Sequence, residues 1–349
     1  GVLGTATIAR NHTLPGMLEA ENCELYAIAG RDPEKTAQFQ KDFGFQKVYH
    51  SYDELLDDEN IDAVYIPLPN QLHKEWTIRA ARKKKHVLCE KPLAPTEEEV
   101  REVVDVCRQE GVLLMEAFAY LHSNATREVI EAVRNGVVGK PVFVETTFIV
   151  KPWQKENIRM RRETFGGCTY DQGCYNLSLT LQLLDEMPDE IQAMAHYMPN
   201  GVDDLSTVYM HFPSGASACA VSGLCSGQRA DRYFIHGTEG TLEAPLPYNA
   251  KGTLAYYIHK NGETIKKEVE VPSNYRLEAE QFGRCILEGE EPLVSNEFSI
   301  KTAHVLTEAL KKTFENRGHS FTIAQFEQVM TFDNDDAMQK KWKAFIRKI

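Results

Sequence analysis

The chain has 349 residues, 39 Lys and Arg against 51 Asp and Glu, and a formal net charge of −12 at pH 7. This acidic balance argues against nucleic acid as a partner, and no apolar run reaches the ~18 residues that a membrane-spanning helix needs. The composition, with 42% hydrophobic and 26% charged residues, is that of a folded protein of about two domains.

The eight cysteines indicate a reducing compartment. They form no C-x-x-C pair and no Cys/His grouping with zinc spacing, so we expect no metal site. Several, such as Cys89 and Cys107, lie among apolar residues, as buried free thiols do. Unpaired thiols predict a cytoplasmic protein.

Strands and helices alternate along the first third of the chain. Asp32-Pro33 supplies an N-cap and a first-turn proline, and Thr96 with Glu99 forms a capping box. The expected strands cover residues 2–3, 25–30, 63–66, 87–90 and 112–115, with helices over about 7–20, 71–85 and 96–110. Apolar strands between such helices predict a doubly wound parallel sheet in a first domain over residues 1–118.

Residues 119–349 have a different pattern, and we expect them to form a second domain. Asn261-Gly262 predicts a type I′ hairpin turn, and short strand candidates follow one another without long helices between most of them. An antiparallel sheet is therefore expected. The predicted strands are 142–150, 191–197, 207–212, 216–221, 233–236, 254–259 and 264–271, and the predicted helices 175–184, 277–288, 299–316 and 336–349.

The segment Gly4-Thr5-Ala6-Thr7-Ile8-Ala9 lies between the first strand and the first helix. It fits the pattern G-x-G-x-x-G with alanine at the second and third glycine positions. Small residues there let the backbone approach a diphosphate, and a helix N-terminus offers free N–H groups to it. We therefore predict that residues 4–8 bind a dinucleotide; the alternative is an ordinary strand-to-helix turn.

The end of the second strand distinguishes the two nicotinamide cofactors. An acidic residue there binds the ribose of NAD, and an arginine suits the 2′-phosphate of NADP. Arg31 has the planar guanidinium that a phosphate requires, and Asp32 is accounted for as a helix cap. The sequence favours NADP, with NAD as the alternative.

Two further strand ends carry polar residues. Leu68, Pro69 and Asn70 follow the strand at 63–66, and His73 lies one turn later. Glu90 and Lys91 end the next strand, before a proline. Because ligands bind at the carboxyl ends of parallel strands, we expect these residues at the cofactor. The alternatives are a rigid turn with a surface histidine and an ordinary solvated lysine.

A dense group of polar and small residues occupies 165–175. Gly166-Gly167 allows a sharp turn, and a following helix would place Asp171 and Tyr175 on one face at i and i+4. The alternative is a plain helix start with a half-buried tyrosine.

Taken together, these segments resemble the glucose–fructose oxidoreductase, inositol dehydrogenase and rhizopine catabolism family. The resemblance rests on GVLGTATIA, PLPNQLH, CEKP, MEAF and FGGCTYDQGCY. Tyr175, where many members carry histidine, makes the chain most similar to the branch of dimeric dihydrodiol dehydrogenase and NADP-dependent D-xylose dehydrogenase.

The resemblance implies an N-terminal Rossmann domain and a C-terminal α/β domain with an open, mostly antiparallel sheet. That second domain, residues 119–349, would bind the substrate and pair in a homodimer, and its last helices would pack on the first domain. It also implies a cis Lys91–Pro92 peptide bond, and it assigns Glu116, Trp153 and Arg159 to the cofactor or substrate.

The expected activity is hydride transfer between a nicotinamide and a secondary alcohol or carbonyl of a sugar or cyclic diol. Tyr175 would move the proton, Lys91 would lower the pKa of Tyr175 and stabilise the substrate oxygen, and Asp171 would orient Lys91 or the substrate hydroxyl. The roles of Lys91 and Tyr175 are interchangeable at this point. Two alternatives remain: epimerisation or glycoside cleavage with a tightly bound cofactor, and an inactive NADP-sensing regulator.

Overall fold

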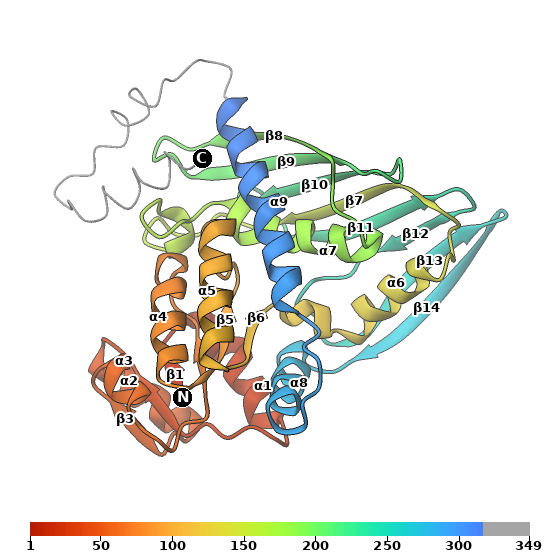
Figure 1. Ribbon diagram of the computed structural model, residues 1–349. Coiled ribbons are helices and arrows are strands. Elements are labelled where there is room, and N and C mark those ends of the chain that lie inside the picture. The colour runs from red at the N-terminus through yellow and green to blue at the C-terminus, as the bar shows by residue number, and fades with distance from the viewer. Residues whose placement is uncertain (317–349) are drawn as a thin grey trace.

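The computed structural model describes residues 1–316, and its first part is built on a six-stranded, entirely parallel sheet (Figure 1). The strand order is β3-β2-β1-β4-β5-β6, which confirms the doubly wound arrangement. The strands are β1 Val2–Leu3, β2 Ala27–Ala29, β3 Lys47–Tyr49, β4 Ala63–Ile66, β5 His86–Glu90 and β6 Leu114–Ala117. The helices are α1 Leu14–Glu19, α2 Pro33–Phe43, α3 Tyr52–Leu56, α4 Asn70–Arg82 and α5 Glu97–Glu110.

Local sequence explains most of these elements. The side chains of Asp32 and Thr96 cap α2 and α5 by accepting backbone N–H groups, as the capping patterns predict, and Ser51 caps α3 in the same way. The central strands are apolar and buried on both faces, as coverage by helices on both sides requires. The expected helix over 7–20 contains a π-helical segment, η1 Ala9–Thr13, before α1.

The second part contains an eight-stranded sheet in the order β14-β13-β12-β11-β7-β10-β9-β8. The pair β7–β10 is parallel and the other pairs are antiparallel, which confirms a mostly antiparallel sheet. The strands are β7 Pro141–Ile149, β8 Glu190–Tyr197, β9 Asp203–His211, β10 Ser217–Gly223, β11 Ala230–Gly237, β12 Thr241–Ala244, β13 Gly252–Lys260 and β14 Glu263–Val271.

Helices lie on one face of this sheet (Figure 1). They are α6 Asn124–Arg134, α7 Cys174–Leu184 and α9 Asn296–Glu315, while α8 Asn274–Glu288 lies beside α1. Short helical turns, η2 Ala119–His122 and η3 Ile158–Met160, and a second π-helical segment, η4 Thr169–Gly173, complete the chain. The helix expected at 336–349 lies outside the described residues.

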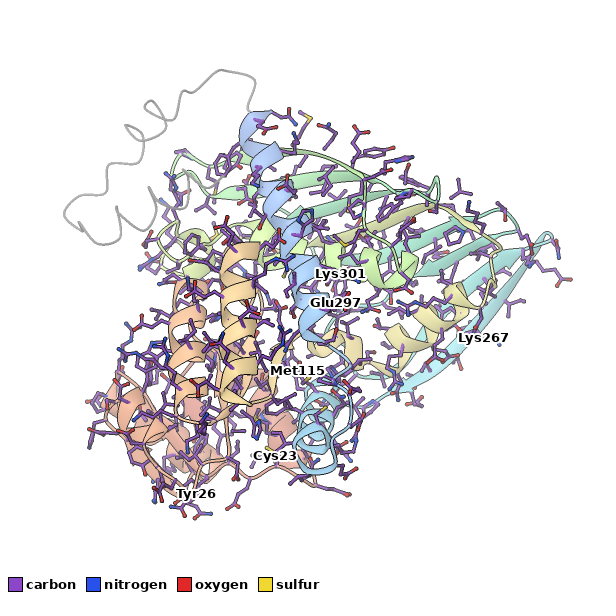
Figure 2. All side chains as sticks on the ribbon, viewed as in Figure 1. Cys23, Tyr26, Met115, Lys267, Glu297 and Lys301 are labelled. Carbon is purple, nitrogen blue, oxygen red and sulfur yellow. The ribbon has the colours of Figure 1, made fainter. Side chains whose placement is uncertain are left out.

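The last two helices contact the parallel-sheet part of the molecule. The side-chain amide of Asn22 donates to the Glu280 carbonyl at 2.8 Å, and the Glu97 N–H donates to Thr307 Oγ1 at 3.1 Å. Glu297 and Lys301 form an ion pair of 2.8 Å on the solvent side of α9 (Figure 2). The two sheets are therefore joined by helices from the end of the described chain.

Candidate active site

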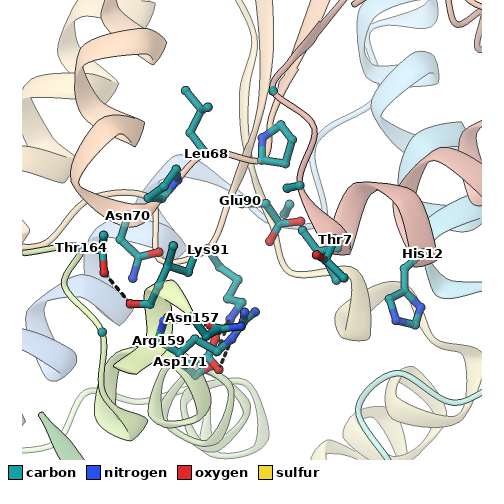
Figure 3. A pocket seen from close by; sticks show the side chains of 18 of the residues that line it. Thr7, His12, Leu68, Asn70, Glu90, Lys91, Asn157, Arg159, Thr164 and Asp171 are labelled. Atoms are coloured by element: carbon teal, nitrogen blue, oxygen red, sulfur yellow. Dashed lines mark hydrogen bonds and ion pairs between the residues drawn. The ribbon is translucent and has the colours of Figure 1, made fainter. Parts of the chain in front are cut away.

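A cavity of about 660 Å³ lies between the two sheets, at the carboxyl ends of the parallel strands (Figure 3). Its volume is in the usual range for ligand sites. All predicted site residues except Glu116 line it: Gly4, Thr5, Ala6, Thr7, Ile8, Arg31, Leu68, Pro69, Asn70, His73, Glu90, Lys91, Trp153, Arg159, Asp171 and Tyr175. The topology thus brings together segments that are far apart in the sequence.

The turn after β1 forms one end of the cavity. Gly4 has φ +111°, a conformation that favours glycine, and an added Cβ would meet Leu68 Cδ2 at 3.0 Å. Its N–H donates to the Ala29 carbonyl at 2.7 Å. The helix that follows starts at this turn, so its first N–H groups and its positive dipole end face the cavity. These features fit a diphosphate.

Arg31 and Lys35 both line the cavity near this turn. The Asp32 carboxylate accepts the Lys35 N–H at 3.0 Å as the cap of α2, so it is already engaged. Lys35 was not predicted. It could have been identified from its position, because it lies one turn after Arg31 in a helix whose start the sequence did indicate.

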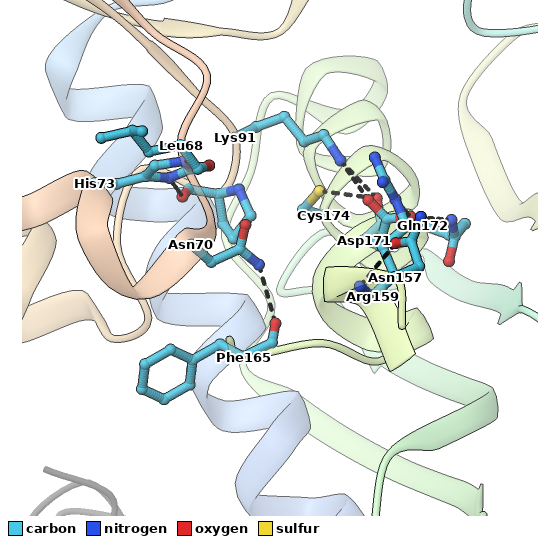
Figure 4. A network of polar contacts seen from close by, with 11 residues as sticks. Leu68, Asn70, His73, Lys91, Asn157, Arg159, Phe165, Asp171, Gln172 and Cys174 are labelled. Carbon is cyan, nitrogen blue, oxygen red and sulfur yellow. Dashed lines mark hydrogen bonds and ion pairs between the residues drawn. The ribbon is translucent and has the colours of Figure 1, made fainter. Parts of the chain in front are cut away.

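His73 is fully buried and braces two loops (Figure 4). Its Nε2 lies 2.7 Å from the Leu68 carbonyl oxygen, and its Nδ1 lies 2.8 Å from the Pro92 carbonyl oxygen. Burial lowers the pKa of His73. The alternative of a surface histidine is therefore wrong. Both ring nitrogens are engaged with the protein, so neither is left for a ligand.

Lys91 and Asp171 form a buried ion pair. Lys91 Nζ lies 2.9 Å from Asp171 Oδ1 and donates to the Asp171 carbonyl at 3.0 Å. The second carboxylate oxygen, Oδ2, accepts from Arg159 Nε and from Gln172 Nε2, each at 2.6 Å (Figure 4). The Lys91–Pro92 peptide bond is cis, as the resemblance implies.

Charge pairing outweighs burial for both members of this pair. Burial alone would lower the pKa of Lys91, but the carboxylate of Asp171 raises it above its usual value. Burial alone would raise the pKa of Asp171, but Arg159 and Lys91 hold it well below its usual range. Both groups are charged at neutral pH, so Lys91 presents a stable ammonium to the cavity.

Tyr175 lies next to Lys91, but not in the arrangement that we expected. Lys91 Nζ lies 4.8 Å from the centre of the Tyr175 ring, over its face. Burial, and then the nearby Glu90, raise the pKa of Tyr175 well above 10. The expectation of a lowered pKa for Tyr175 is therefore wrong, because burial outweighs the lowering effect of the neighbouring Arg159. Within residues 1–316 the Tyr175 hydroxyl has no hydrogen-bond partner, so it is free to meet a ligand.

Glu90 lines the cavity and accepts a hydrogen bond from the Tyr65 hydroxyl at 2.6 Å. Burial raises the pKa of Glu90. Glu116 instead lies behind the cavity wall, where its Oε1 accepts the Leu93 N–H at 2.9 Å and burial raises its pKa to about 7. This geometry gives Glu116 a bracing role behind the Lys91–Pro92 turn.

The substrate end also contains residues that sequence reasoning missed. They lie in the first helix, in the loops beside β11 and β12, and at the start of α8, where no motif marks them. They are Asn11, His12, Arg229, Asn249 and Tyr275. Trp153 and Arg159 were predicted, and here the Arg159 guanidinium carbon lies 5.1 Å from the centre of the Trp153 ring.

Comparison with known proteins accounts for this combination of fold and site. Residues 1–118 match the oxidoreductase family with an NAD-binding Rossmann fold, and residues 126–243 match the GFO/IDH/MocA C-terminal domain. The chain belongs to this family. As a GFO/IDH/MocA protein it is an oxidoreductase of the NAD(P)-dependent dehydrogenase and reductase type, which confirms the predicted family and enzyme class.

Relatives within the family differ in substrate. A D-xylose 1-dehydrogenase (NADP(+)) from Haloferax volcanii is 34% identical over 88% of this chain and 94% of its own. A trans-1,2-dihydrobenzene-1,2-diol dehydrogenase from Xenopus tropicalis is 27% identical over 84% of this chain and 91% of its own.

Solved structures agree with the family assignment. A 3-ketoreductase from Actinomadura kijaniata, crystallised with NADP and TDP-benzene, has a TM-score of 0.84 and 27% identity over 89% of this chain and 96% of its own. An aldose-aldose oxidoreductase from Caulobacter crescentus has a TM-score of 0.84 and 28% identity over 90% of this chain and 97% of its own.

Proposed function

We propose that this protein is an NADP-dependent oxidoreductase that transfers a hydride between the nicotinamide and a secondary alcohol or carbonyl of a sugar or cyclic diol. The observation that carries the proposal is the Lys91 ammonium, fixed by Asp171 beside the free hydroxyl of Tyr175 in the cavity of a Rossmann domain. Relatives named as xylose, diol and sugar-nucleotide oxidoreductases support this class of substrate.

The residues of the cavity fit NADP. The Gly4 turn and the helix N-terminus suit the diphosphate, and the charges of Arg31 and Lys35 suit a 2′-phosphate. Asp32, which would bind the ribose hydroxyl of NAD, is engaged as a cap. When bound, the nicotinamide supplies the hydride chemistry.

The protein supplies position and protons. Lys91 stays protonated, so it donates to the substrate oxygen and stabilises negative charge there instead of acting as a base. Tyr175 holds its proton at neutral pH, so in the direction of reduction its hydroxyl protonates the substrate oxygen. In the direction of oxidation, Tyr175 must first release its own proton to solvent, and the phenolate then accepts the proton of the substrate hydroxyl as the carbonyl forms.

Titration of the purified protein with NADPH and NADH, followed by nicotinamide fluorescence, tests the cofactor. We expect tight binding of NADPH and at least ~10-fold weaker binding of NADH, since a phosphate–arginine contact is a charge-assisted hydrogen bond. Preference for NADH would overturn the assignment of Arg31. Cofactor that copurifies and does not exchange would favour the epimerase or glycoside-cleaving alternative. Absence of binding would favour an inactive protein.

We also propose that the protein works in the cytoplasm. The eight cysteines, all within the described residues, are free thiols, as a reducing compartment keeps them. None of the helices in residues 1–316 has the length and apolar character needed to cross a bilayer.

A further inference from the structure

The substrate end of the cavity contains a guanidinium group, that of Arg229, which the proposed reaction does not use. Resting on the function proposed above, we propose that the substrate is an anionic sugar or polyol, and that Arg229 binds its carboxylate or phosphate while Lys91 and Tyr175 act on a hydroxyl-bearing carbon. The shared chemistry is an oxyanion at one end of a polyhydroxylated chain.

Arg229 is held in a fixed orientation. Its Nε lies 2.9 and 3.0 Å from the two carboxylate oxygens of Asp231, and its Nη2 lies 2.5 Å from Oδ2. The side chain of Asp231 is 1% exposed and also accepts the Tyr248 N–H at 3.1 Å. The Arg229 guanidinium carbon lies 5.2 Å from the centre of the Phe148 ring. Because one edge and one face of the guanidinium contact the protein, its other edge is available to a ligand.

That other edge is open. The Arg229 side chain is 46% exposed, it lines the cavity, and its Nη1 has no hydrogen-bond partner among residues 1–316. A guanidinium matches the planar geometry of a carboxylate and the oxygens of a phosphate. The pairing with Asp231 therefore orients the group without using all of its donors.

Arg229 and Lys91 contact two neighbouring aromatic rings of the same cavity. Arg229 lies over Phe148, whose ring centre is 5.3 Å from that of Tyr175. Lys91 lies over the Tyr175 ring. The two cations therefore contact different rings, so one ligand that lies along both rings could meet both cations.

The charges around this end favour an anion. Lys91, Arg159 and Arg229 are cationic, whereas Asp171 and Asp231 supply two ionised carboxylates to pair with them. Among the other titratable groups, burial raises the pKa of Glu90. Burial and then the charge of Arg229 lower the pKa of His12, so His12 adds no positive charge at neutral pH. Glu156 also lines the cavity, so the cation that we assign to the ligand is identified by the open Nη1 edge of Arg229 and not by a count of charges.

Steady-state kinetics with matched sugars test the proposal. D-glucose, D-glucuronate and D-glucose 6-phosphate are compared with NADP⁺ in excess, and formation of NADPH is measured. We expect at least ~10-fold higher kcat/KM for one of the two anions than for glucose, because charge-assisted hydrogen bonds contribute that much. Preference for glucuronate or for the phosphate distinguishes the two sources of the anion.

Variants test whether the preference for the anion depends on the Arg229 guanidinium. Arg229→Gln is expected to lower kcat/KM for the anion by ~10–100-fold and to leave that for glucose within about 3-fold. Arg232→Gln is the matched control, since Arg232 lies outside the cavity on the exposed side of β11. Asp231→Asn removes the paired carboxylate and is expected to keep the preference for the anion. The ratio of the two substrates separates a binding role from general loss of folding.

The same kinetic measurements can overturn the proposal of an anionic substrate. Turnover of glucose with no preference for either anion, or equal loss of both activities in Arg229→Gln, overturns it and leaves the proposed redox function intact. If no sugar is turned over, calorimetry of glucuronate and glucose 6-phosphate with the protein–NADP⁺ complex decides. Binding that Arg229→Gln abolishes supports the anion site, and no binding overturns it.

Discussion

Asp171 is the residue on which the charges of the active site depend, because each of its carboxylate oxygens binds a different cation. The pair keeps Lys91 protonated in a place where burial alone would favour the neutral amine. Since the pKa of Asp171 is depressed, its ion pairs stabilise the folded state at neutral pH, and this contribution is lost as the pH falls through that pKa.

Replacing Asp171 with Asn should make the activity sensitive to alkaline pH. Without the carboxylate, burial lowers the pKa of Lys91, so the ammonium deprotonates at a lower pH than in the unaltered enzyme. We expect the alkaline fall of reductive kcat/KM to begin at a lower pH in this variant than in the parent. Asp189→Asn, on the surface, is the control. Parallel pH profiles would contradict this role for Asp171.

Tyr175→Phe tests the proton donor. General acid catalysis contributes about 10²–10⁴-fold, so we expect kcat to fall by that amount while the dissociation constant for NADPH stays within about 3-fold. The tyrosine hydroxyl has no partner among the described residues, so its removal leaves no unpaired group behind. Tyr257→Phe, on β13 and outside the cavity, should leave kcat unchanged. Undiminished turnover in Tyr175→Phe would exclude the role.

The reacting residues could be predicted from sequence because each lies at a strand end or in a marked turn. Lys91, Asp171 and Tyr175 come together as the motifs indicate. The direction of the Tyr175 pKa shift was not predictable, since it depends on the depth of burial and on Glu90. Arg229 was not predictable either, because its position depends on how the second sheet packs.

At the scale of elements, two of the helical segments that reach the cavity begin with π-helical turns. The segments η1 and η4 precede α1 and α7, and η4 contains Asp171. Such turns are often found at functional sites. The sequence predicted continuous helices here, because a π turn has no clear residue pattern. Strands β3 and β12 and helix α6 were also missed: the two strands are short, and β3 is partly exposed.

Gly167→Ala tests the turn that positions Asp171. Gly167 has φ +118°, and an added Cβ would overlap the carboxylate of Asp203, which holds the Thr169 N–H at 2.7 Å. A left-handed conformation costs a residue with a Cβ about 1–3 kcal/mol, so we expect a melting temperature lower by roughly 5 °C or more, with loss of kcat. Gly227→Ala, where the added Cβ meets open space, is the control in the same thermal scan. Equal melting temperatures would contradict this account.

At the scale of the whole molecule, the eight-stranded sheet has helices on one face and none of the described residues covering the other (Figure 1). Its open face exposes Met194, Leu205 and Tyr209, which are 68%, 38% and 40% exposed. Apolar side chains gathered on one face are typical of an interface. We propose that two copies pair through this face, as the family resemblance implies.

Sedimentation velocity at micromolar concentration tests the dimer. Met194→Glu places a charge on the open face and should shift the protein toward the monomer, because burying an unpaired charge is costly. Ile265→Glu is the matched control: Ile265 pairs across strands with the buried Ile258, so it points to the other side of the sheet. A monomeric parent protein would contradict the proposal.

The contacts of α8 and α9 with the parallel-sheet part affect how the chain folds as it is synthesised. The backbone at Tyr275 and Arg276 packs so closely on Gly16 that an added Cβ would lie 2.7 Å from it. The parallel-sheet part is synthesised before α8 and α9, which cover it. At a synthesis rate of ~5–20 residues per second, its apolar surface stays exposed for many seconds before these helices emerge. We expect nascent chains stalled before residue 274 to be more sensitive to protease in the α1 and α5 region than the released protein. Equal protection in both would show that this region folds without its later partners.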